Sequence, residues 1–174
     1  MKSGEHGLRD HLRLLAPMFG LIAAVWALRW IMALASTPPG LVRMMSVSVA
    51  GAVAVLVAVV MIHFKRFGGY TSVVVSAFLL VLWEEILIVA AILCTMVTGI
   101  ENLYTVPEFG FGESYLHHIA GHVTYGLGVE GIFAAGMGCV LLWVLRRLVP
   151  IKDLTRSGRH VILHDSGSVK RSGE

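Results

Sequence analysis

Charged residues are scarce in this chain. Of its 174 residues 14% are charged and 56% are hydrophobic, and the mean hydropathy is +0.78. A soluble domain of this length needs less apolar surface to build one core. The excess must therefore face lipid, and the composition predicts an integral membrane protein. The excess of basic over acidic residues indicates how the chain is oriented in the membrane, and it does not indicate nucleic-acid binding.

Cysteine is almost absent too. Cys94 and Cys139 are the two in the chain, and they fall near opposite ends of two predicted helices, about 20 Å apart in depth. They cannot pair within one chain, which argues against a quinone-linked disulfide exchanger because that function needs reactive pairs. No nucleophile motif is present. An enzyme acting on a lipid or quinone is therefore the weakest functional hypothesis, and the sequence leans away from catalysis.

The hydrophobic residues fall into four stretches, each near the roughly 20 residues that cross about 30 Å of hydrocarbon. They predict an all-α bundle of four transmembrane helices at about 14–35, 41–62, 72–98 and 116–147. Residues 1–13 form an N-terminal segment, 14–150 the transmembrane domain, and 151–174 a basic tail with the composition of a mobile end.

Lysine and arginine are missing from the segment between the third and fourth stretches, which carries Glu101, Glu108 and Glu113. Basic residues instead precede the first helix, lie between the second and third, and follow the fourth. Because such residues mark the cytoplasmic side, both termini are predicted to be cytoplasmic in a multi-pass protein of the cell inner membrane. Arg43 is the exception, and its long side chain could snorkel to the interface.

The first stretch has an alternative interpretation as a cleaved signal peptide, because Ala33-Leu34-Ala35 resembles a processing site. Cleavage would leave three helices. The apolar region is about twice the usual length of a signal core, and it contains Arg29, so a retained helix is favoured.

Four ionisable residues lie inside the predicted helices: Arg29, Glu84, Glu85 and Glu130. Depth in the membrane is counted at 1.5 Å per residue from the cytoplasmic end of each predicted helix, and by this count all four residues lie about 20–24 Å deep. An unpaired charge in hydrocarbon costs several kcal/mol, so these groups are expected to face one another. Three acids and one arginine would leave at least one carboxyl protonated at neutral pH, which is a condition for a proton or cation site.

Neighbours on a helix point about 100° apart, so only one of Glu84 and Glu85 is expected to face inward. We expect this to be Glu84, because Ala77, Ala91 and Thr98 continue its side at intervals of seven residues. Glu85 would then face an oligomer or a partner protein. An equally weighted alternative for the whole group is a static Arg/Glu network that holds the helices together.

Three histidines open the fourth helix, and His118 and His122, four residues apart, share one side, as two ligands of a transition metal would. His117 and Glu113 are further tentative ligands. Polar residues at the interface explain the pattern without a metal, and this alternative is favoured. Haem is disfavoured, because the other histidines fall near the cytoplasmic end and cannot oppose His118 or His122 across one bundle.

Two functional hypotheses remain. In the first, the Arg/Glu group is a proton- or cation-responsive site of a transport or redox-associated protein, with His118 and His122 at its outer mouth. In the second, the chain is a non-catalytic structural or assembly subunit, in a homo-oligomer or a larger membrane complex.

Overall fold

The computed structural model describes residues 6–35, 37–99, 102, 104 and 114–149. These residues are helical wherever they are regular, and no strand occurs among them. The tentative ligand Glu113 and the tail at 151–174 lie outside the described residues.

Four helices are long and apolar enough to cross a membrane: Leu8–Leu34, Gly40–Phe64, Tyr70–Thr98 and Tyr115–Leu148. The sequence therefore predicted their number and approximate positions. The first is α1 (Leu8–Leu34) and the third is α4 (Tyr70–Thr98). Gly99 ends α4 in the left-handed conformation, with φ at 69°, which glycine adopts without steric cost.

The second apolar stretch is not one regular helix. It consists of α2 (Pro39–Met44) and α3 (Val47–Phe64). The backbone leaves the helical conformation at Met45, and the Ser46 side chain accepts a hydrogen bond from the Val49 amide at 3.4 Å. Serine is a favoured N-cap, so α3 begins afresh at this point.

The fourth stretch contains α5 (Tyr115–Gly121), η2 (His122–Glu130) and α6 (Gly131–Leu148). The Ser114 side chain caps α5 by accepting from the His117 amide at 3.2 Å. The middle part, η2, is a π-helix, which the apolar pattern did not predict. Such wide turns are rare and occur often at functional sites.

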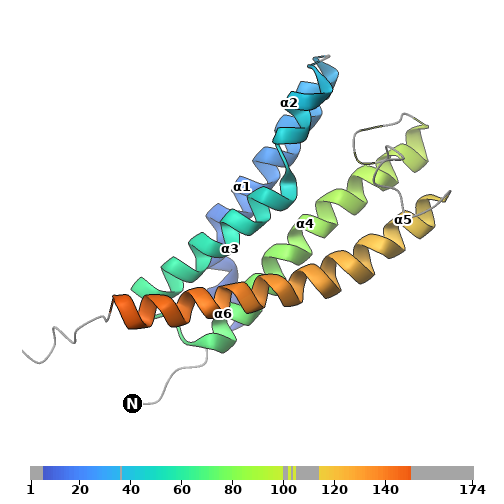
Figure 1. Ribbon diagram of the computed structural model, residues 1–174. Coiled ribbons are helices and arrows are strands. Elements are labelled where there is room, and N and C mark those ends of the chain that lie inside the picture. Colours follow the sequence, from blue (N-terminus) through green and yellow to red (C-terminus); the bar gives the residue numbers. More distant parts are fainter. Residues whose placement is uncertain (1–5, 36, 100–101, 103, 105–113, 150–174) are drawn as a thin grey trace, which may run out of the picture.

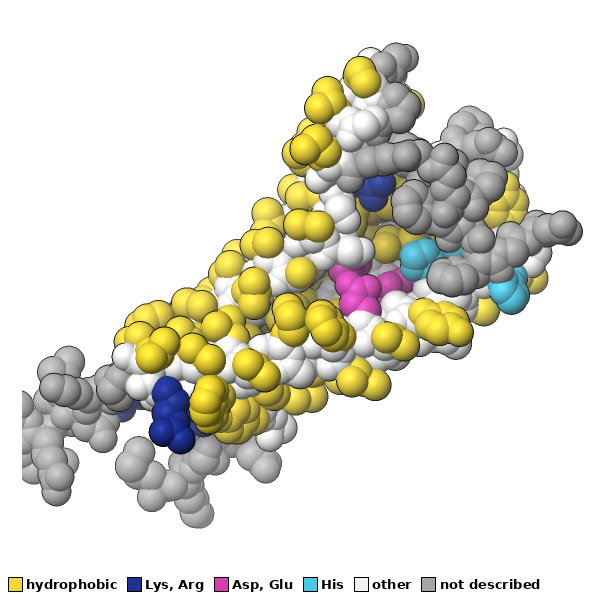
Figure 2. Space-filling model, viewed as in Figure 1, with side chains coloured by type: hydrophobic (Ala, Val, Ile, Leu, Met, Phe, Trp, Pro, Cys, Tyr) yellow, Lys and Arg dark blue, Asp and Glu magenta, His cyan; other side chains and the backbone are white. Residues whose placement is uncertain are grey.

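The bundle is closed at one end and divergent at the other (Figure 1). The start of α1, the α3–α4 turn and the end of α6 lie together at the closed end, where His63 Nε2 lies 3.0 Å from the Val149 carbonyl oxygen. Described Lys and Arg side chains gather here, so we call it the basic end (Figure 2).

At the other end, which we call the open end, α1 and α2 diverge from α4 and α5 (Figure 1). We call these two pairs of helices the two arms. Within the described residues α3 packs against α1, α4 and α6, whereas α5 and η2 pack against α4 but not against α3. The core that joins α1, α3 and α4 includes the fully buried Leu15, Ala54 and Leu80. Helix α4 is thus the central element, and its middle faces the angle between the two arms.

Candidate functional site

Acidic side chains gather in the angle where the two arms separate, with histidine beside them (Figure 2). The group consists of Glu84 and Glu85 on α4 and Glu130 at the end of η2, and we call it the carboxyl cluster. Glu84 lies within electrostatic range of both other carboxyls, and Glu130 lies within range of Glu85. The structure therefore brings together the three acids that the sequence singled out.

Glu84 is fully buried, with 0% of its surface exposed, and neither carboxylate oxygen makes a hydrogen bond of good geometry, although the Ser48 side chain lies near enough to interact with the carboxyl. It points toward α3, where the backbone of Gly51 leaves the space that the carboxyl occupies. A Cβ atom at position 51 would overlap Glu84 Oε2 and lie 3.2 Å from its carboxyl carbon. Glycine at position 51 thus allows α3 to pack against a buried acid.

Glu85 is buried as well, so the expectation that it faces away from the bundle is wrong. Its carboxylate lies 2.9 Å from His122 Nδ1 and fills the space beside Gly126, where any Cβ would overlap it. The physical reason is that α4 has neighbours on two sides. Glu84 faces α3 and Glu85 faces η2, so residues 100° apart can both be buried.

The histidine pair belongs to the same polar group. The rings of His118 and His122 stack with centroids 5.1 Å apart. His118 is buried and its Nε2 has no partner, while His122 Nδ1 contacts Glu85. Polar side chains therefore continue from His118 through His122 to the carboxyl cluster. The sequence analysis expected the histidine pair at the outer mouth of the acidic site, but it did not predict a contact between His122 and Glu85.

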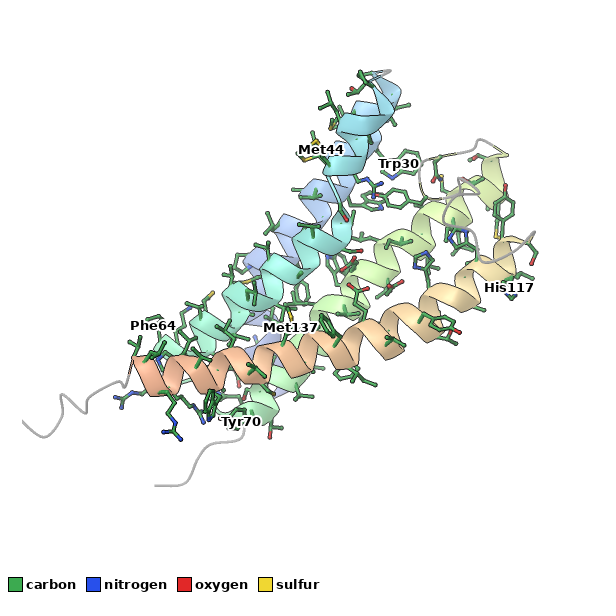
Figure 3. The ribbon with its side chains drawn as sticks, in the orientation of Figure 1. Trp30, Met44, Phe64, Tyr70, His117 and Met137 are labelled. Carbon is green, nitrogen blue, oxygen red and sulfur yellow. The ribbon has the colours of Figure 1, made fainter. Side chains whose placement is uncertain are left out.

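The tentative metal site is not assembled within the part of the chain that the structure describes, where no group of three or more His, Cys, Asp or Glu residues could hold a metal ion. His117 is exposed and projects away from the bundle near the start of α5 (Figure 3).

Arg29 lies against an aromatic ring rather than against a described carboxylate. Its guanidinium carbon is 4.8 Å from the ring centroid of Tyr104. Tyr104 is positioned by Asn102, whose side-chain oxygen accepts from the Tyr104 amide at 2.8 Å and whose amide group donates to the Ala91 carbonyl at 2.7 Å. This connection to α4 places Tyr104 over α1, an arrangement that no local sequence pattern indicates.

Tyr104 remains protonated at neutral pH. Burial raises the pKa of its hydroxyl to about 12, although the positive charge of Arg29 acts in the opposite direction. We therefore expect an alkaline absorbance titration of the wild type, minus that of Tyr104→Phe, to give a phenolate transition near pH 12. A difference transition near 10, the ordinary value for tyrosine, would show that the ring is not buried.

The glycine beside Glu84 gives a second prediction. Gly51→Ala should lower the free energy of unfolding by about 1–3 kcal/mol, because its methyl group would displace a buried carboxyl. The double substitution Gly51→Ala/Glu84→Ala should lose less than the sum of the two single ones. Gly136→Ala is the matched control, since nothing lies within 4 Å of a Cβ at that position. Thermal unfolding in detergent measures all four proteins, and equal losses at positions 51 and 136 would refute the packing described here.

Comparison of this chain with protein-family models, with curated proteins and with solved structures finds no match. The function must therefore be argued from the site itself.

Proposed function

We propose that this chain is a multi-pass protein of the cell membrane in which the carboxyl cluster and His122 form a proton- or cation-linked site. Transport or a redox-associated role would use such a site. We place both termini on the cytoplasmic side, because the basic residues gather at one end of the bundle.

Membrane insertion is supported by the outer surface of the helices. Large apolar side chains are exposed on every long helix, among them Leu28 at 42%, Val53 at 45%, Ile86 at 48% and Phe133 at 66%. Soluble monomers rarely expose apolar surface so continuously, whereas lipid covers it at no cost.

The observation that carries the functional proposal is the state of Glu84. Its two carboxylate oxygens are buried without a hydrogen bond of good geometry, with the Ser48 side chain nearby and two further acids beside them. A purely structural polar network satisfies its buried members, since an unpaired buried charge costs several kcal/mol. A bound proton or cation would remove this cost at Glu84, and its release would restore it. The group is therefore suited to exchange a proton or a cation.

The surroundings favour access from the open end. Glu130 is partly exposed, and the carboxyl cluster lies where the two arms diverge. Toward the basic end the next layer of the core is apolar, with the fully buried Leu15 and Leu80 packed in one cluster with Met18. Beyond this layer, the buried His11 and Ser76 side chains lie 3.2 Å apart. An apolar layer of this kind prevents ions from crossing unless the helices move.

The proposal is tested by reconstituting the protein into liposomes that contain a trapped pH-sensitive dye. Under a pH or sodium gradient the wild type should change the internal pH faster than empty liposomes, and Glu84→Gln should abolish the difference. Asp10→Asn is the matched control, because it makes the same chemical change at an exposed acid near the start of α1. Flux equal to wild type in a folded Glu84→Gln protein would exclude the proposed role.

The second candidate is a structural or assembly subunit, and the His122–Glu85 contact favours it. At 2.9 Å this hydrogen-bonded contact connects η2 to α4, as a static link between helices would. In that case Glu84→Gln and Glu85→Gln would disrupt the fold or a co-purifying complex, and no gradient-dependent flux would be seen in the wild type.

A further inference from the structure

A second polar group lies outside the carboxyl cluster. Four buried polar atoms have no hydrogen-bond partner and belong to neighbouring side chains: Trp26 Nε1, Arg29 Nε, Trp30 Nε1 and the Tyr104 hydroxyl. We call these four residues the donor cluster. Trp26, Arg29 and Trp30 are three and four residues apart, so they share one face of α1.

The four side chains are in contact. The rings of Trp26 and Trp30 have centroids 6.0 Å apart, and those of Trp30 and Tyr104 are 6.4 Å apart. Arg29 lies over the Tyr104 ring. Trp30 projects from α1 on the side that faces α4 (Figure 3). The cluster therefore lies at the open end, between the two arms.

The chemistry of this group is one-sided. Indole and guanidinium nitrogens only donate hydrogen bonds, and Tyr104 keeps its proton at neutral pH, so it can donate as well. The Arg29 guanidinium lies near the Tyr104 hydroxyl without the geometry of a full hydrogen bond. Because a guanidinium can only donate, this contact leaves the hydroxyl proton free for another acceptor. Leaving several buried donors unpaired is costly, and one group with several acceptor oxygens could satisfy them together.

We propose that Trp26, Arg29, Trp30 and Tyr104 bind an oxyanion, a phosphate or carboxylate group, that enters from the open end. The positive charge of Arg29 selects an anion over a neutral acceptor, and its planar guanidinium suits both kinds of group. The site is distinct from the carboxyl cluster, so it does not depend on the proposed function. The oxyanion could come from a phospholipid headgroup or from a small soluble anion.

Binding is tested by intrinsic tryptophan fluorescence of the purified protein in an uncharged maltoside detergent, because two of its four tryptophans belong to the cluster. Sodium phosphate, sodium acetate and short-chain phosphatidylglycerol are added separately at constant ionic strength. A saturable change with phosphate or acetate identifies a soluble anion, and saturation with the lipid alone identifies a headgroup. Either result supports the site.

The variants connect this signal to the named residues. Tyr104→Phe removes one donor and keeps the ring, so the dissociation constant should rise about tenfold, as the loss of one hydrogen bond to a charged group predicts. Arg29→Gln should abolish saturation. Arg147→Gln is the matched control, since Arg147 also lies 5.5 Å from a tryptophan ring, that of Trp143 at the basic end, and its removal should change nothing. The proposal is overturned if no probe saturates in the wild type, or if Tyr104→Phe and Arg29→Gln bind as the wild type does.

Discussion

Replacing His122 by alanine is expected to lower the free energy of unfolding by about 3 kcal/mol. His122 Nδ1 lies 2.9 Å from Glu85, whose side chain is only 7% exposed. Removing the imidazole leaves a buried carboxylate beside two other acids without its only described ion-pair partner. Removing one half of a buried polar pair is costly because the other half is left buried without a partner. Unfolding in a denaturing detergent, followed by circular dichroism, measures the loss.

A second substitution shows whether this explanation holds. Glu85→Gln replaces the carboxyl group that contacts His122 by a neutral amide, so the double variant His122→Ala/Glu85→Gln should recover most of the stability lost in His122→Ala. If the double variant is as unstable as the sum of the two single variants, the residues are not coupled and the loss has another origin.

Among substitutions that add one methyl group to η2, Gly126→Ala is expected to lower the free energy of unfolding the most. The added Cβ would overlap the Glu85 carboxylate, which is already held by His122, so the side chain cannot move aside without breaking that contact. We expect a loss of about 1–3 kcal/mol.

Gly128→Ala, two residues away in the same π-helix, provides the comparison. A Cβ there meets nothing within 4 Å, so this variant should be neutral or up to about 1 kcal/mol more stable, given the better helix propensity of alanine. Thermal unfolding of both variants under one condition decides the question, and a stability order reversed from this one would contradict the position of Glu85.

The helices could be predicted closely because long apolar runs leave few alternatives. The prediction of 72–98 became Tyr70–Thr98, and that of 116–147 became Tyr115–Leu148. The prediction of 14–35 became Leu8–Leu34, so the first helix begins inside the segment that the sequence placed before it. The break at Met45–Ser46 was not predicted, because the apolar run continues through it and the interruption depends on a backbone turn and one side-chain cap.

The site was predictable only in part. The number of residues from the cytoplasmic end of each helix placed Glu84, Glu85 and Glu130 at one depth in the membrane, since the rise per residue is a property of the helix itself. Which neighbour each acid faces depends on packing between distant segments. The pairing of Glu85 with His122 joins residues 37 positions apart, and no local pattern specifies it. The same holds for the space provided by Gly51 and Gly126, which exists only once α3 and η2 are packed against α4.

The two polar groups divide the open end between them. The carboxyl cluster offers acceptors and exchangeable protons, while the donor cluster offers hydrogen-bond donors and one positive charge. Tyr104 lies within electrostatic range of both Arg29 and Glu84, so it connects the two groups. A ligand or proton bound at one group would therefore change the electrostatic potential at the other, without being shared between them.

The most direct test of the proton- or cation-linked site is infrared spectroscopy of the carboxyl C=O stretch in lipid bilayers, at neutral pH with and without sodium. We predict a protonated-carboxyl band in the wild type that moves on exchange into D₂O, responds to pH or to sodium, and is absent from the Glu84→Gln/Glu85→Gln/Glu130→Gln protein. A wild-type spectrum in which all carboxyls are ionised at neutral pH without added cation, and which neither pH nor sodium changes, would contradict the proposal.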